Sequence, residues 1–141
     1  MSQHTVRYPI PETSRGLTRR TAVGVLAAIT AVLLTQAAVD VVSVELGVTG
    51  PIDPFAVGPL VGACIAAGVG AALAYAAVVR VTVRPVRTFL ALSAGVFVLM
   101  LVPVFGMPPA GITAAGQGIL VLYHVLVAVP LVASILGVVT L

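Results

Sequence analysis

The arginines of this chain occupy only two places, and four long apolar stretches lie between and after them. One group precedes the first stretch, and the other separates the second stretch from the third. The two groups are Arg7, Arg15, Arg19 and Arg20, and Arg80, Arg84 and Arg87. Short loops rich in arginine stay on the cytoplasmic side of a membrane. An even number of crossings must therefore separate the groups, and two stretches lie between them.

The composition favours a membrane protein over a soluble one. Only 8% of the residues are charged and 60% are hydrophobic, whereas a soluble domain carries about 25% charged residues. A soluble chain of 141 residues could not bury this much apolar surface, because small domains keep much of their surface in water. The net charge of +3 suits anionic lipid headgroups, and we expect no nucleic-acid partner because no soluble basic fold is present.

The apolar stretches predict four membrane-spanning helices; the first is long enough to cross about 30 Å of hydrocarbon at about 1.5 Å per residue, and the third is shorter. The predicted spans are about 21–44, 55–79, 88–105 and 117–141. Residues 1–20 are predicted to form a cytoplasmic, mostly disordered basic arm, and residues 21–141 the membrane domain. The predicted fold is an all-α, antiparallel four-helix transmembrane bundle in the cell (plasma) membrane, with both termini cytoplasmic.

The connections between the spans contain turn-forming residues. Residues 47–54 and 106–116 are rich in Gly and Pro, and residues 80–87 form a short basic turn. Pro130 is expected to kink the last span, because it removes one hydrogen bond of the helix. The two hairpins suggest a weak pseudo-symmetry, but we find no residue-level repeat between them.

Arg19 and Arg20 before an apolar run also resemble part of a twin-arginine export signal, with a cleavage site near Ala37. The apolar run is longer than the core of a signal peptide. The residues after the arginine pair also lack the bulky aromatic side chain of that pattern. We therefore expect span one to be retained rather than cleaved.

Polar side chains within the spans are few, and these are the candidates for function because ionisable groups are costly in a membrane. Gln36 and Asp40 share one face of span one, and Gln117 and His124 share one face of span four. The helical rise places all four in the same outer slab of the membrane. The first and last helices of a four-helix bundle lie side by side. The sequence therefore predicts one polar cluster of Gln36, Asp40, Gln117 and His124, opening outward.

A structural role for these residues is the alternative. Interhelical polar contacts of this kind stabilise a membrane bundle by about 0.6 kcal/mol on average. A haem site is a weak possibility, because a single span histidine would need a second ligand from another chain. The only cysteine, Cys64, excludes an intrachain disulfide and a Cys-rich metal site. We expect no metal, no cofactor and no catalytic residue.

A stripe of small residues runs along span two at intervals of four positions. It consists of Gly58, Gly62, Ala66, Gly70 and Ala74. Such stripes let helix backbones approach closely, and we predict that this one packs against another span of the same chain. A second subunit is the alternative. Tyr75 and Phe89 are expected near the inner headgroups, and Phe55 and Phe105 near the outer ones.

The whole chain resembles an uncharacterised family of small four-helix membrane proteins from actinobacteria and haloarchaea. The resemblance rests on Arg19 to Val23 at the start of span one, the Gly/Ala-rich second span, the basic 80–87 turn and the last span with His124. It implies a topology and no catalytic residue.

Three functions are compatible with these patterns. The first is a non-enzymatic accessory or assembly subunit, acting as a homo-oligomer or within a larger membrane complex, because short loops leave little soluble surface. The second is a transporter or channel component for a small solute or protons that uses the polar cluster between spans one and four. The third is a protein or enzyme that binds lipid, quinone or isoprenoid, with His124 as the acid/base group.

Overall fold

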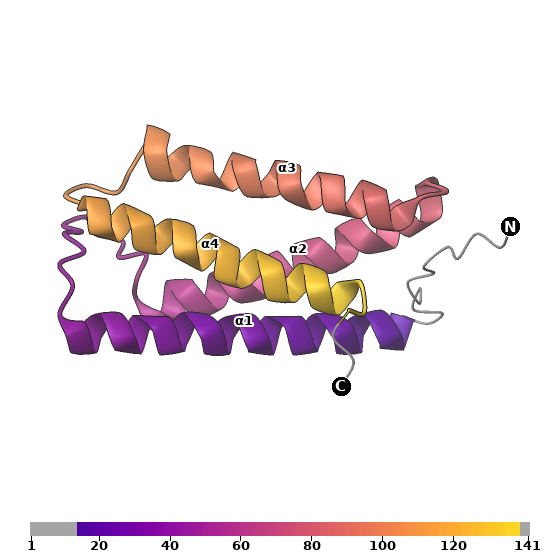
Figure 1. The fold of residues 1–141 in the computed structure, drawn as a ribbon, viewed down its shortest axis with the longest axis horizontal. Coiled ribbons are helices and arrows are strands. Elements are labelled where there is room, and N and C mark those ends of the chain that lie inside the picture. Colours follow the sequence, from indigo (N-terminus) through magenta and orange to yellow (C-terminus); the bar gives the residue numbers. More distant parts are fainter. Residues whose placement is uncertain (1–13, 139–141) are drawn as a thin grey trace, which may run out of the picture.

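The computed structural model describes residues 14–138 and consists of four long helices. They are α1 (Ser14–Val42), α2 (Val57–Val81), α3 (Pro85–Gly106) and α4 (Ala114–Ile135). In Figure 1 the loops 43–56 and 107–113 lie at one end, here called the loop end, and the α2–α3 turn lies at the other, here called the arginine end. All four helices are long and apolar enough to cross a membrane. The predicted all-α class and the four candidate spans are confirmed.

The first helix begins earlier than predicted. Residues 15–20 are helical rather than part of a disordered arm, and Leu17 packs against a buried cluster that contains Tyr75 and Phe89. This apolar contact explains the extension, because it adds a partly buried apolar side chain to the first turns of α1. The remainder of the predicted arm, residues 1–13, lies outside the described residues.

The last helix ends earlier than predicted, at Ile135 rather than at residue 141. Gly137 has a φ of +74°, and the amide of Val138 donates to the carbonyl of Ala133 at 2.9 Å. This is the glycine-terminated end in which a left-handed residue satisfies the last carbonyls. The guanidinium of Arg20 also donates to the carbonyl of Ile135 at 3.3 Å, so the end of α4 is fixed to the start of α1.

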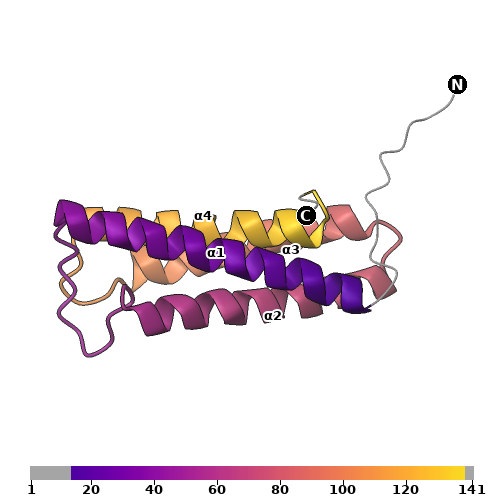
Figure 2. The same ribbon diagram turned by 90° about the horizontal axis from the view of Figure 1, so that it is seen from below.

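The first and last helices lie side by side and form the most extensive helix pair (Figures 1 and 2). α2 contacts all three other helices, whereas α1 and α3 do not contact each other within the described chain. α3 is the most peripheral helix, because only Phe89 and Val104, near its two ends, are buried. The middle of α3 therefore stands away from the bundle.

The loop end is closed by pairing between the two loops. The amide of Thr49 donates to the carbonyl of Ala110 at 2.9 Å, and the amide of Thr113 donates to the carbonyl of Leu46 at 3.0 Å. Gly47 and Gly111 face each other at the centre, each with a φ of +78°. A Cβ atom on either would overlap the carbonyl oxygen of the other, so glycine is required at both positions.

The two paired segments carry the same Gly-x-Thr triplet. Gly47-Val48-Thr49 follows α1, and Gly111-Ile112-Thr113 precedes α4. In each segment the amide of the threonine donates to a carbonyl of the other segment, and that carbonyl belongs to the residue just before the glycine. The loops therefore meet through a local two-fold arrangement. The repeated Gly-x-Thr triplet was its only trace in the sequence, and it is too short to stand out.

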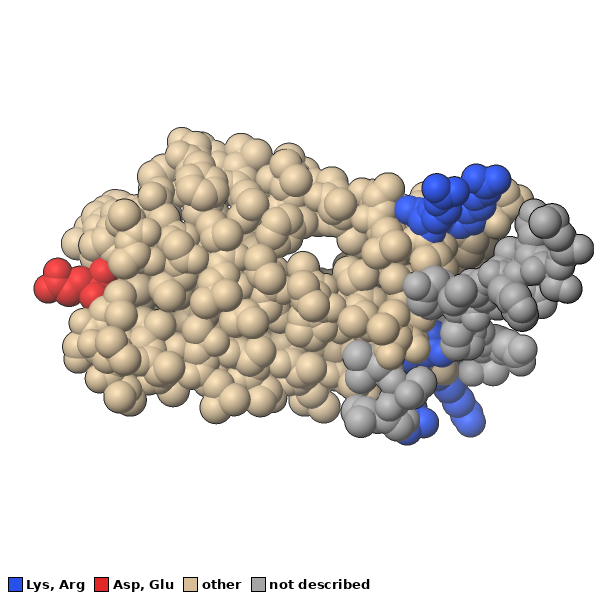
Figure 3. Space-filling view, in the orientation of Figure 1, with Lys and Arg blue, Asp and Glu red and all other residues tan. Residues whose placement is uncertain are grey.

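Charge is separated along the long axis of the molecule. Figure 3 shows acidic side chains at the loop end and arginines at the opposite end. Arg80, Arg84 and Arg87 are exposed there, as is Arg19, whereas Arg20 is partly buried against the end of α4. The arginines within residues 14–138 that are predicted to set the topology thus gather at one end of the helices.

Candidate functional site

A chain of polar contacts joins α1 to α4. Gln36 Nε2 donates to Asp40 Oδ1 at 2.7 Å along α1, and the hydroxyl of Tyr123 on α4 donates to Gln36 Oε1 at 2.5 Å. Gln36 and Tyr123 are buried, and Asp40 is exposed. The buried amide is therefore satisfied at both its nitrogen and its oxygen. Sequence reasoning missed Tyr123 as the partner of Gln36.

Gln117 makes a different contact, with α3. Its Nε2 donates to the carbonyl of Val104 at 3.1 Å. That carbonyl lies in the last turn of α3, and the residue four positions further on is Pro108, which has no amide hydrogen to donate. Gln117 thus supplies a donor that the helix end lacks.

His124 faces neither of these groups. Its Nδ1 lies 2.6 Å from the carbonyl oxygen of Leu120 on its own helix. A residue on an α-helix is turned by about 100° from its neighbour, so Tyr123 faces α1 while His124 faces the space between α2 and α3. The predicted single cluster of Gln36, Asp40, Gln117 and His124 is wrong as a unit. The structure divides it into three separate contacts.

A cavity of about 630 Å³ lies between α2, α3 and α4, and His124 is on its wall. Its volume falls within the range of about 300–1,000 Å³ that is usual for sites of small molecules. The wall is almost wholly apolar, and His124, Ser93, Tyr123 and Cys64 are its polar or thiol side chains. The hydroxyl of Tyr123 is already bonded to Gln36.

The cavity exists because α3 stands off and because α2 offers small side chains to it. The lining residues of α2 include Ala63, Ala67, Gly70, Ala71 and Ala74. Between the buried residues near its ends, α3 contributes only partly buried or exposed side chains. Figure 3 shows an opening through the molecule between α3 and α4, so the cavity communicates with the surface that lipid would cover.

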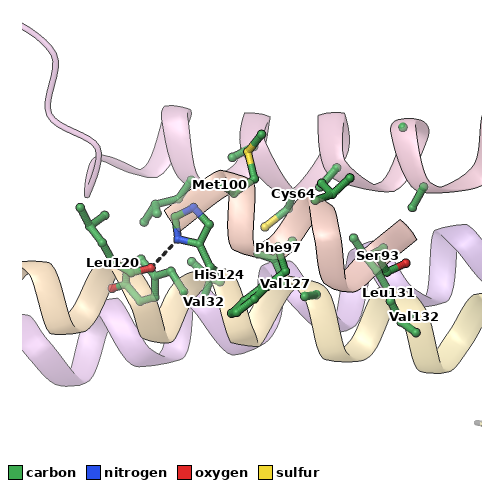
Figure 4. Close-up of a pocket in the computed structure, with 18 of the residues that line it drawn as sticks. Val32, Cys64, Ser93, Phe97, Met100, Leu120, His124, Val127, Leu131 and Val132 are labelled. Atoms are coloured by element: carbon green, nitrogen blue, oxygen red, sulfur yellow. Dashed lines mark hydrogen bonds between the residues drawn. The ribbon is translucent and has the colours of Figure 1, made fainter. Parts of the chain in front are cut away.

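The cavity is elongated. Its lining on α2 runs from Pro59 to Ala74, which corresponds to about 22 Å of helix. A sphere with the same volume of about 630 Å³ would be only about 11 Å across. The cavity is therefore longer than it is wide, and its volume is in the usual range for a ligand pocket. Figure 4 shows His124 close to Leu120 near one end of the lining, with Leu131 and Val132 toward the other.

Two aromatic pairs bound the cavity. Near the loop end, Phe55 packs edge-on against Tyr123 with ring centroids 6.1 Å apart. Toward the arginine end, Tyr75 packs edge-on against Phe89 at 5.1 Å. Phe55, Tyr75 and Phe89 are all buried, so these rings pack inside the bundle near its two ends. Of the predicted belt, only Phe105 is exposed.

The small-residue stripe does not make the intrachain contact that was predicted for it. A Cβ atom on Gly58, Gly62 or Gly70 would meet nothing within 4 Å, and Ala66 is exposed. Within the stripe, Gly70 and Ala74 line the cavity, and only Ala74 also packs against the buried cluster near Tyr75. The helix twist carries the rest of the stripe to the outside of the bundle.

The close approach of α2 to its neighbours occurs instead at Gly68. A Cβ atom there would overlap Val25 of α1 and lie 3.6 Å from Leu131 of α4. Gly24 on α1 plays the matching role, because its Cβ would lie 3.1 Å from the Cα of Leu131. Neither glycine belongs to the small-residue stripe, so the stripe predicted close packing of α2 but on the wrong face of that helix.

The side chains of this site are suited to binding a molecule. His124 supplies one imidazole, and the remaining wall supplies apolar contacts. Within residues 14–138, no three His, Cys, Asp or Glu side chains are close enough to hold a metal ion together. Nothing in the sequence indicated the cavity itself, because it depends on how far α3 stands from α2.

Comparison with curated proteins and with solved structures finds no match for this chain. A family profile does match, over residues 12–140. These residues include all four helices and nearly the whole sequence. The chain therefore belongs to the family of unknown function DUF6069.

Proposed function

We propose that this chain is a multi-pass protein of the cell membrane that binds one elongated hydrophobic molecule in the cavity between α2, α3 and α4. In this proposal the helices form an antiparallel bundle with both termini in the cytoplasm, and the arginine end faces inward. The loop end, with its acidic residues, faces outward. The protein acts by binding and has no catalytic residue.

The cavity is the observation that carries the proposal. It has the volume of a small-molecule site, an apolar wall and an opening toward the lipid-covered surface. A hydrophobic molecule could enter it from the hydrocarbon layer without crossing a polar surface. A hydrophobic molecule there would make dispersion contacts with the side chains of α3 that line the cavity.

The same observations weigh against the transport alternative. A path for a solute or for protons needs polar groups along its length, but the polar chain that starts at Asp40 ends at Tyr123. The cavity beyond Tyr123 has a mostly apolar wall. Catalysis is also disfavoured, because His124 has no carboxylate or nucleophile bonded to it among the described residues.

The test is to fill the cavity and analyse what the purified protein carries. Ala67→Phe places a ring in the cavity, and Ala66→Phe places the same ring on the neighbouring exposed position. Mass spectrometry of organic extracts should find a hydrophobic molecule in stoichiometric amount with the wild type and with Ala66→Phe. Ala67→Phe should lose it. Equal amounts in both variants, or none in the wild type, would refute the proposal.

An accessory role in an assembly is the second candidate. The exposed Gly58, Gly62 and Ala66 favour it, because they present a smooth helix face that no part of the described chain covers. Faces of this kind allow close packing of helices in membranes. A second copy of the chain or a larger membrane partner could cover it, and both functions could coexist because this face lies outside the cavity.

A further inference from the structure

The hydrogen bond of His124 fixes which of its nitrogens carries a proton. Nδ1 lies 2.6 Å from the carbonyl oxygen of Leu120. A backbone carbonyl can only accept, so Nδ1 must be the donor. In a neutral imidazole the other nitrogen, Nε2, is then an acceptor and cannot donate. The backbone of α4 thus determines the chemistry that His124 presents.

Nε2 presents this acceptor to the cavity. Figure 4 shows the imidazole among the lining side chains, with its second nitrogen directed away from the carbonyl of Leu120. Among residues 14–138, the hydrogen bond to Leu120 is the only one assigned to His124. The lining around it is almost wholly apolar, and an acceptor that meets no donor beside such a wall costs an amount comparable with a lost hydrogen bond. A ligand that donates to Nε2 removes this cost.

The position of His124 sets the orientation of the ligand. From His124 to Val132 the cavity continues along α4 for eight positions, or about 12 Å. Its wall there includes Leu131, Val96 and Phe89, with Ser93 as a polar side chain on α3. A polar group at His124 therefore leaves about 12 Å of apolar wall for a chain that runs toward the arginine end.

We infer that the molecule bound in this cavity is a long-chain alcohol or phenol, whose hydroxyl donates to His124 Nε2 and whose apolar chain extends toward Phe89. This inference rests on the proposed function and names the ligand class of the same site. Ethers, esters and quinones carry acceptors only, so they leave Nε2 without a donor. Prenols and hydroquinones share the required hydroxyl.

The test compares dodecanol with its methyl ether, which retains the chain and loses only the donor. Binding to the purified protein is measured by titration calorimetry in detergent micelles, with Ala67→Phe as the blocked site. The wild type should bind the alcohol about tenfold more tightly than the ether, the size expected for one buried hydrogen bond. His124→Leu should lose this preference, and dividing the wild-type preference by that of the variant cancels any difference in the partition of the two compounds into micelles.

A second measurement does not depend on the folding of a variant. The ¹⁵N resonance of Nε2 in the wild type should move when dodecanol is added, and the ether should leave it in place. If both compounds bind equally and Ala67→Phe blocks both, the hydroxyl inference is overturned while the proposed function stands. If neither compound binds the wild type more tightly than it binds Ala67→Phe, the hydroxyl inference and the proposed function are both overturned.

Discussion

The hydroxyl of Tyr123 donates to Gln36 Oε1 at 2.5 Å, and this contact ties the last helix to the first near the loop end. The two residues lie 87 positions apart in the sequence, and both are buried. The amide nitrogen of Gln36 is held in turn by Asp40 at 2.7 Å. The exposed carboxylate of Asp40 therefore orients the amide of Gln36, and this orientation directs Gln36 Oε1 toward the hydroxyl of Tyr123.

Removing the hydroxyl should destabilise the bundle without emptying its core. Tyr123→Phe keeps the ring against Phe55 but leaves Gln36 Oε1 without a donor, at a cost of about 1–3 kcal/mol. Unfolding in a denaturing detergent measures the loss. In a double-mutant cycle with Gln36→Leu, the coupling should lie between about 0.6 and 1.7 kcal/mol. Strictly additive effects would show that the contact contributes nothing to stability.

The two glycines of α2 that differ most in their surroundings give a matched pair. Gly68→Leu should lower the free energy of unfolding of the monomer by about 1–3 kcal/mol, the usual cost of overpacking. The reason is that a side chain at Gly68 overlaps Val25. Gly62→Leu should leave the stability of the monomer within about 0.5 kcal/mol of the wild type, because the position is open. The same unfolding assay measures both.

Gly62→Leu also distinguishes the two roles proposed for α2, which are to line the ligand cavity and to present an exposed face to a partner helix. If a partner helix covers the exposed face, the variant should reduce association, measured by analytical ultracentrifugation in detergent. It should retain the bound hydrophobic molecule. A Gly62→Leu protein that unfolds as readily as Gly68→Leu would contradict the placement of the stripe on the outside.

The paired loops predict a strong requirement for glycine. Gly111→Ala should lower the free energy of unfolding by more than about 2 kcal/mol, because a left-handed backbone costs about 1–2 kcal/mol for other residues and the Cβ would overlap the carbonyl of Gly47. Gly50→Ala is the control, since the space around Gly50 is open. Equal stability of the two variants would mean that the loops do not pair in the membrane.

The proposed topology predicts which turns are reached from outside the cell. In a Cys64→Ala background, a cysteine at Gly50 should react with a membrane-impermeant maleimide in intact cells. A cysteine at Arg84 should react only after the membrane is opened. The opposite pattern would invert the bundle, and equal labelling of both sites in intact cells would contradict the crossing of the membrane by α2.

The four helices could be predicted because their signal is local. Hydropathy and the spacing of the arginines can be read from single stretches of sequence. In lipid, the backbone polar groups of each stretch must bond to one another, which favours a helix over other backbone conformations. The ends were harder to predict, because they depend on distant partners. α1 extends to Ser14, where Leu17 meets the cluster of Tyr75 and Phe89, and α4 stops where Gly137 and Arg20 cap it.

The contacts of the polar residues could be predicted only in part. The spacing of Gln36 and Asp40 correctly placed them on one face of α1. Whether His124 or Tyr123 faces α1 depends on the rotation of α4 about its axis, which its nearly uniform apolar surface does not specify. The cavity depends on the separation of α2 and α3, and no residue pattern records that distance.

The most direct measurement of the central claim is photolabelling with a photoactivatable long-chain alcohol, followed by peptide mapping of the protein in lipid nanodiscs. The account predicts saturable labelling on the cavity residues Ala67, Val96 and Val127, competed by dodecanol and lost in Ala67→Phe. The exposed Leu26 and Leu34 of α1 serve as the lipid-facing reference. Labelling spread equally over α1 and the cavity, without competition, would contradict a binding site between α2, α3 and α4.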